Sequence, residues 1–178
     1  MTTTDDLRAG AVLFTDLVGF TEYNESVGDR AALDVLDAQT AMATTVVDAH
    51  RGARIVKELG DGLMLWFAEP ADAVAGASAL LDAIDEARDG GAFPLPVRMG
   101  LHFGTVLPRG DDVVGQTVNI AARLSDLAGP GELLVSEAAI DAIDDGPPPP
   151  VCAVGPIRVK GLREPIWVHC VERTGEPA

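Results

Sequence analysis

This 178-residue chain is poor in aromatic residues, positive charge and cysteine. Aromatic residues make up only 4% of a sequence that is 47% hydrophobic, so an aliphatic core is expected. The net charge of −15 provides no basic surface for a nucleic acid or for an anionic membrane, and neither is expected as a partner. Lys57 and Lys160 are the only lysines, which makes each position informative if the protein binds an anion.

The two cysteines, Cys152 and Cys170, are too few for a disulfide framework. They would pair if adjacent strands placed them opposite each other, but a reduced pair of small apolar residues suits a cytosolic protein better. The first residues lack the basic and apolar regions of a signal peptide. No apolar run approaches the roughly 18–20 residues of a membrane span. We therefore expect a soluble, cytoplasmic protein.

Hydrophobic periodicity predicts a mixed α/β (α+β) fold. Strands are expected over 10–15, 53–59, 63–68, 96–104, 132–136, 154–160 and 166–171, with a polar excursion over 106–116. Helices are expected over 29–50, 70–88 and 117–127, and a short one after 136. The buried face of the first helix is expected to contain Ala32, Leu33, Leu36, Ala43, Val46 and Val47.

The order of these elements predicts a ferredoxin-like βαββαβ core followed by a C-terminal helix and β-hairpin extension. Four consecutive prolines over 147–150 indicate an extended surface spacer. No internal repeat or long interior linker divides the chain. We therefore expect one domain over 8–172, with a flexible N-terminus over 1–7 and a C-terminal tail over 173–178.

Two aspartates stand next to glycine-containing turns at predicted strand ends. Asp16 follows the apolar run 11–15, and Asp61 lies between Gly60 and Gly62 in a predicted hairpin. Carboxylates in such turns suit a divalent cation that carries a polyphosphate, and neighbouring strands would let the two share a metal site. Each also has an ordinary explanation: Asp16 as a helix cap, and Asp61 as a turn residue that pairs with Lys57.

A second polar group lies on the predicted helix 117–127. Asn119 and Arg123 are four residues apart, so they share one face of a helix whose other residues nearby are apolar. An arginine beside a reacting phosphate can hold developing charge, although it could equally pair with one of the many acids. Lys160 in the closing hairpin could likewise be an edge-strand lysine that discourages aggregation.

Together, the segments 14–21, 57–62, 112–123 and 159–161 resemble the catalytic domain of the class III nucleotidyl cyclases, the adenylate and guanylate cyclases. The resemblance covers roughly residues 8–172. It implies two metal ions per active site, Mg²⁺ or Mn²⁺, on Asp16, Asp61 and the backbone carbonyl of Leu17. It also implies a set of residues that contact the phosphates, namely Val18, Gly19, Phe20 and Thr21 through backbone N–H groups, and Lys160.

The resemblance further implies an adenylate cyclase. Lys57 and Asp112 match the pair that reads the edge of the purine, where guanylate cyclases typically carry Glu and a Cys-type residue. Asn119 would orient the ribose, and Arg123 would stabilise charge at the α-phosphate. The reaction would convert ATP into 3′,5′-cyclic AMP and pyrophosphate by in-line attack of the ribose 3′-hydroxyl, so the enzyme is a lyase that needs no protein nucleophile. His102 is then expected to be structural.

In this family the active sites lie between two catalytic domains, so the resemblance implies a homodimer. Asp16 and Asp61 would come from one protomer, and the purine, ribose and arginine residues from the other. Regulation of this signalling enzyme would come from dimerisation, metal level or an unidentified outside partner. The alternatives are a guanylate or relaxed-specificity cyclase, and a catalytically weak nucleotide-binding signalling module. Such a module should have lost a metal aspartate, Asn119 or Arg123, and all of these are present.

Overall fold

The computed structural model describes residues 7–144, 146–160 and 162–173, so most of the two predicted terminal segments lies outside it. The strands are β1 (Arg8–Leu17), β2 (Arg54–Leu59), β3 (Gly62–Phe67), β4 (Val97–Arg109), β5 (Asp112–Val114), β6 (Leu133–Ser136), β7 (Val151–Ile157) and β8 (Ile166–Val171). The helices are α1 (Phe20–Val27), α2 (Asp29–Ala49), α3 (Pro70–Asp89), α4 (Gln116–Leu127) and α5 (Glu137–Asp141). None of the helices in these ranges is long and apolar enough to cross a membrane.

The strands form one sheet in the order β2-β3-β1-β4-β6-β8-β7, with β5 paired to the far end of β4. β1 is antiparallel to β3 and β4, whereas β6 joins β4 in parallel. The half that contains β2, β3, β1 and β4 is the predicted ferredoxin-like core, and β6, β8 and β7 extend it. The mixed α/β fold predicted from the sequence is confirmed.

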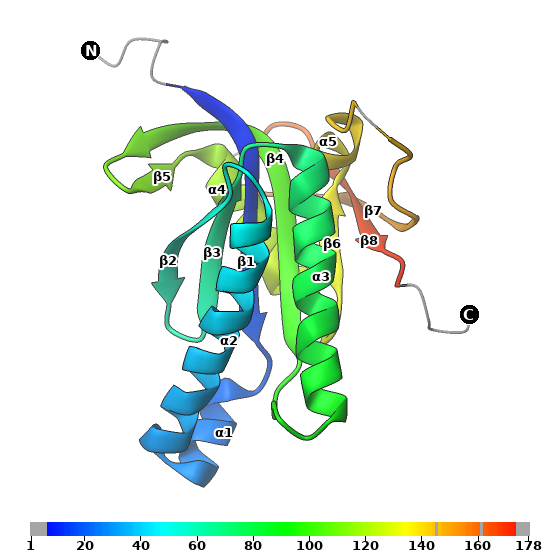
Figure 1. Cartoon of the computed structure of the whole chain (residues 1–178). Helices are drawn as coiled ribbons and strands as arrows, with labels where there is room; N and C mark the ends of the chain where they lie inside the picture. Colours follow the sequence, from blue (N-terminus) through cyan, green and yellow to red (C-terminus); the bar gives the residue numbers. More distant parts are fainter. Residues whose placement is uncertain (1–6, 145, 161, 174–178) are drawn as a thin grey trace.

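Helices cover both faces of the sheet. Figure 1 shows α2 and α3 in front of the central strands and α4 behind them. Along β1, Leu13 packs into the core shared with α2 and α3, whereas Val12 packs into a smaller core shared with Ala121 of α4. Side chains alternate along a strand, so this register sends Thr15 to the α2 side and Asp16 to the α4 side.

Four details differ from the prediction. β4 continues to Arg109, into the predicted polar excursion. Residues Phe20–Val27 form α1, a short helix that the prediction did not include; none of its residues is fully buried, although Phe20 and Tyr23 pack against the core. The closing hairpin begins with Val151–Ile157 instead of 154–160, which leaves Lys160 in the connection to β8. Pro156 lies within β7, the outermost strand of the sheet. An edge strand tolerates a proline, because the N–H groups on its open side need no partner. On α2, Leu33 is 50% exposed, and Gln39 is buried instead.

The closing hairpin places Cys152 directly opposite Cys170, and both thiols are free in this part of the described chain. The Cys152 thiol donates a hydrogen bond to Oε1 of Glu172 at 2.8 Å, which raises the pKa of Cys152. Burial raises the pKa of Cys170. Oxidation to a disulfide proceeds through a thiolate, so both effects slow oxidation of the pair.

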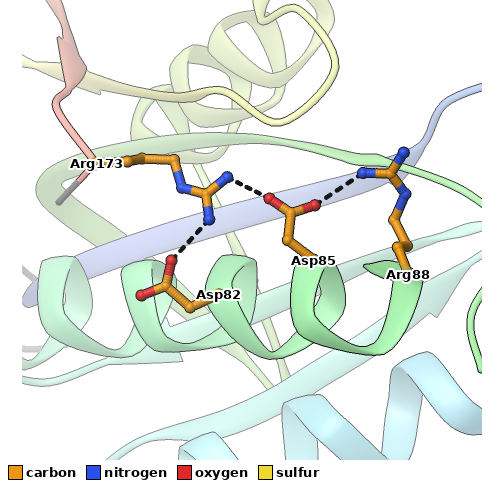
Figure 2. Close-up of polar contacts among 4 residues, drawn as sticks. All are labelled: Asp82, Asp85, Arg88 and Arg173. Atoms are coloured by element: carbon orange, nitrogen blue, oxygen red, sulfur yellow. Dashed lines mark hydrogen bonds and ion pairs between the residues drawn. The ribbon is translucent and has the colours of Figure 1, made fainter. Parts of the chain in front are cut away.

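The end of the sheet extension is fastened to α3 by a short chain of ion pairs (Figure 2). Arg173, two residues beyond β8, donates to Asp82 at 2.9 Å and also to Asp85. Asp85 accepts a second hydrogen bond from Arg88 at 3.0 Å. The carboxylate of Asp85 therefore bridges two guanidinium groups, one from α3 and one from the end of the described chain.

Candidate functional site

Two carboxylates come together where β1 ends and the β2–β3 hairpin turns. Asp16 lies opposite Gly62, the residue that follows Asp61. Gly60 has φ 66°, a left-handed conformation that suits glycine at this tight turn. A Cβ on Gly62 would lie 2.4 Å from the carbonyl oxygen of Thr15. The absence of a side chain at this position therefore lets the hairpin approach β1 closely.

The electrostatics of this pair fit a divalent cation. Burial, and next the negative charge of Asp16, raise the pKa of Asp61. A bound cation would relieve both effects, because it favours the charged carboxylates. Within the described ranges, no cluster of three or more His, Cys, Asp or Glu side chains could hold a metal. A pair of carboxylates suits Mg²⁺ or Mn²⁺, which accept one or two carboxylates and complete their shell with water and substrate phosphates.

Leu17 can add only a backbone ligand to this site. Its side chain is buried in the core shared with α2 and α3, on the face of the sheet opposite Asp16. The sequence prediction named its backbone carbonyl, and the structure leaves that assignment as a prediction.

Arg98 on β4 lies directly opposite Asp16 and already contacts its carboxylate. Its Nε and Nη2 atoms lie 2.7 and 2.6 Å from Oδ2 of Asp16. Its Nη1 donates to the carbonyl oxygen of Asp126 in α4 at 3.1 Å. A metal on Asp16 would therefore compete with this guanidinium. The sequence prediction missed Arg98, although a charged residue near the start of an otherwise apolar strand was a usable signal.

Lys57 and Asp112 form an ion pair across the gap between β2 and β5. Lys57 Nζ lies 2.7 Å from Oδ2 of Asp112, and both side chains are about one-third exposed, at 36% and 35%. The hydrogen bond from Lys57 lowers the pKa of Asp112. The structure therefore brings together the two residues predicted to read the purine. It also excludes the ordinary alternative in which Lys57 pairs with Asp61.

Asn119 and Arg123 lie on the outer side of α4. Ile120 and Leu124 bury the other side of this helix, and both candidate residues are exposed. Arg123 has a loose ion pair with Asp126 at 3.9 Å. In the described part of the chain, no hydrogen bond or ion pair joins Asn119 or Arg123 to Asp16 or Asp61.

The predicted phosphate-binding turn is the start of α1. Gly19 has φ 81° and precedes the first helical residue, Phe20. The N–H of Val18 donates to the carbonyl of Pro96 at 2.9 Å, so it is not available to a ligand. The next N–H groups, of Gly19, Phe20 and Thr21, belong to the first turn of a helix, where N–H groups have no helical partner. Lys160 is exposed in the β7–β8 connection.

His102 has a structural environment, as predicted. Its ring is buried, and Nδ1 lies 2.7 Å from Oγ of Ser136. The same hydroxyl oxygen accepts a hydrogen bond from the N–H of Ala139 at the start of α5. Burial lowers the pKa of His102 to about 4, so the ring is neutral at pH 7.

Comparison with known proteins finds relatives over nearly the whole chain. The sequence pattern of the adenylate and guanylate cyclase catalytic domain matches residues 4–173. An uncharacterized protein of Mycobacterium tuberculosis is 37% identical over 153 residues, which are 86% of this chain and 38% of the relative. An adenylate cyclase of Streptomyces coelicolor is 37% identical over 131 residues, which are 74% of this chain and 33% of that enzyme. This chain therefore spans well under half the length of these relatives.

A solved structure agrees in fold. The crystal structure of the adenylyl cyclase CyaB from P. aeruginosa matches with a TM-score of 0.81 at 26% sequence identity. The match covers 94% of this chain and 95% of that one, so it includes the sheet extension as well as the ferredoxin-like core.

Proposed function

Because this chain belongs to the family of class III adenylate and guanylate cyclase catalytic domains, we propose that it is an adenylate cyclase. It would convert ATP into 3′,5′-cyclic AMP and pyrophosphate at sites shared by two copies of the chain. The observation that carries this proposal is the preformed Lys57–Asp112 pair.

The chemistry of this pair favours adenine. The N1 atom of adenine accepts a hydrogen bond and its amino group donates one, which complements a lysine donor and an aspartate acceptor. Guanine reverses both positions, with a donor at N1 and an acceptor at O6. A site that leaves its polar groups unpaired with the wrong base discriminates strongly against that base. ATP is therefore the proposed substrate.

Asp16, Asp61 and the carbonyl of Leu17 would hold two divalent ions, Mg²⁺ or Mn²⁺. Bound there, such ions acidify the attacking hydroxyl and neutralise the leaving pyrophosphate. A cation held by Asp16 would replace the contact of Arg98 with Oδ2, and the Arg98 guanidinium would then be available to a phosphate group.

The other residues would orient the substrate. The N–H groups of Gly19, Phe20 and Thr21 point from the positive end of α1, and with Lys160 they would hold the β- and γ-phosphates. Asn119 would fix the ribose. Arg123 would stabilise the charge that develops at the α-phosphate.

A second copy of the chain would complete each site. The metal aspartates share one end of the core, whereas Asn119 and Arg123 face outward from α4 without contact to either aspartate in the described ranges. A two-fold dimer of this chain would bring the outer side of α4 in one copy to the aspartates of the other. It would create two equivalent sites.

The test is an assay of purified protein with Mn²⁺ and either ATP or GTP. We expect cyclic AMP from ATP and a much slower reaction with GTP. Asp16→Ala should abolish turnover, whereas Asp34→Ala, which removes an exposed acid of α2, should leave it intact. Equal turnover of the two nucleotides would identify a relaxed-specificity cyclase. No product at any protein concentration would favour the catalytically weak nucleotide-binding module.

A further inference from the structure

A buried polar contact lies behind the two metal aspartates, on the α2 side of the sheet. Gln39 is 1% exposed, and its Nε2 donates to Oγ1 of Thr15 at 3.1 Å. Thr15 is 2% exposed, and the same hydroxyl oxygen accepts a hydrogen bond from the backbone N–H of Leu63 at 3.1 Å. One oxygen therefore joins a helix and two strands.

The position of this contact relates it to the metal site. Thr15 immediately precedes Asp16, and its register partner Leu63 is two residues after Asp61. Because side chains alternate along a strand, Thr15 is anchored on the α2 side while Asp16 emerges on the α4 side. The hydroxyl thus fixes the end of β1 against the start of β3 at the level where both carboxylates leave the sheet.

Polar groups are not needed here for packing. The other buried residues of α2 are Ala32, Val35, Ala43, Val46 and Val47, all of them apolar. A buried amide and hydroxyl must find partners, because each unpaired group loses its hydrogen bonds to water. Satisfied polar contacts in a core specify one geometry more strictly than apolar contacts do.

We propose that Gln39 and Thr15 are positioning residues of the metal site, and that they hold Asp16 and Asp61 at the separation a divalent cation needs. Neither residue would touch the metal or the nucleotide. The inference rests on the proposed function for the identity of the two metal-binding aspartates. Partners that orient metal ligands typically change metal affinity by about 10–100-fold when they are removed.

The test measures Mn²⁺ binding directly. Mn²⁺ is titrated into the protein in the presence of 3′-deoxy-ATP, which lacks the attacking hydroxyl, and electron paramagnetic resonance reports the free Mn²⁺. The same titration with nucleotide and no protein gives the baseline. Thr15→Val and Gln39→Leu keep the size of each side chain and remove the contact. Each should weaken Mn²⁺ binding by about tenfold. The double variant should be little worse than Thr15→Val alone, because Thr15→Val already removes the contact with Gln39.

Two further variants separate positioning from stability. Thr15→Ser keeps the hydroxyl and should bind Mn²⁺ as the wild type does. Val46→Ala, which removes core volume from α2 away from this contact, should lower the melting temperature without weakening Mn²⁺ binding. Wild-type Mn²⁺ affinity in folded Gln39→Leu or Thr15→Val protein would overturn the proposal. So would a wild type that binds no Mn²⁺.

The same preparations distinguish this proposal from the proposed function. Cyclic AMP formation with an unchanged Mn²⁺ requirement in the variants would refute the positioning role and leave the cyclase assignment intact. Weakened Mn²⁺ binding in the variants of a protein that makes no cyclic AMP would support the positioning role and refute the cyclase assignment.

Discussion

Lys57 illustrates how the role of one residue depends on its cross-strand neighbours. The sequence left open whether it pairs with Asp61, four positions away, or serves a purine site with Asp112. Only the arrangement of β2 beside β5 puts its ammonium group 2.7 Å from Asp112. The contact of Arg98 with Asp16 was missed for the same reason: the charge of Arg98 stands out in an apolar strand, but its partner depends on the register between distant strands.

Gln39 was missed because periodicity arguments follow apolar residues. The sequence predicted Leu33 on the buried face of α2, but the face is centred on Val35, Gln39, Ala43 and Val46. A glutamine can occupy the buried face of a helix only when its side-chain amide has hydrogen-bond partners. The partner, Thr15, is 24 residues away in the chain.

The buried His102 predicts a pH-dependent stability. Its pKa is lowered from 6.5 to about 4, so between these values the unfolded chain takes up a proton that the folded protein does not. The contribution of the neutral ring is complete above pH 6.5 and is lost as the pH falls toward 4. The free energy of unfolding should fall by about 2 kcal/mol between pH 7 and pH 5 from this residue alone.

Urea unfolding of wild type and His102→Asn at the two pH values isolates this effect. Asparagine keeps a polar atom near Ser136 but does not titrate. The wild type should lose about 2 kcal/mol more than the variant between pH 7 and pH 5. Equal losses in both proteins would show that His102 is not the group that senses pH.

At the scale of elements, periodicity and turn signals predicted α2, α3, α4 and the β2–β3 hairpin closely. These are long or strongly patterned segments with glycine or proline at their ends. α1 was missed because it has only eight residues and none of them is fully buried, and β7 was shifted because prolines precede and interrupt it. The sequence also predicted the existence of α4. It did not predict how closely α4 packs on the sheet, which depends on Gly100 of β4.

Gly100 on β4 sets the approach of α4. A Cβ there would lie 2.1 Å from the backbone N of Ser125 and 2.5 Å from the carbonyl oxygen of Ala121. Backbone atoms cannot rotate away, so Gly100→Ala must push α4 outward. We expect a loss of about 3 kcal/mol in the free energy of unfolding. Displacing Asn119 and Arg123 should also reduce activity.

Gly90→Ala is the matched control for this substitution. Gly90 has φ −76°, and the nearest atom to an added Cβ is 3.4 Å away, so alanine should fit there. Its effect on the free energy of unfolding should stay within about 0.5 kcal/mol. Equal stability of the two variants by urea unfolding would contradict the close packing of α4 on β4.

The bridge at Asp85 should stabilise the attachment of the sheet extension to α3 (Figure 2). Its side chain is 16% exposed and contacts both Arg88 and Arg173, whereas the side chain of Asp82 is 58% exposed. Asp85→Ala leaves two guanidinium groups without this acceptor and should cost about 1–3 kcal/mol. Asp82→Ala should cost less than about 1 kcal/mol, as exposed pairs do. Similar melting temperatures for the two variants would be the contrary result.

At the scale of the whole molecule, the resemblance in four short segments was enough to predict the family and the fold, both of which are confirmed. The division of the site between two copies could not be tested by local patterns. One observation supports the shared site: in the described ranges of a single copy, no hydrogen bond or ion pair joins Asn119 or Arg123 of α4 to the metal aspartates. The chain also spans only part of its relatives, so the activity of a longer protein is a separate proposal.

Complementation between inactive variants tests the shared site most directly. Asp16→Ala damages the metal half and Arg123→Ala the other half, so a dimer of one copy each retains one intact site. Random pairing of equal amounts should restore about a quarter of the wild-type rate of cyclic AMP formation. Mixing Asp16→Ala with Asp61→Ala should restore nothing, because both changes damage the metal half. If native mass spectrometry detects the first heterodimer and no activity returns, the active site is not shared between two copies. If both mixtures recover equally, Asp16 and Asp61 do not belong to the same half of a site.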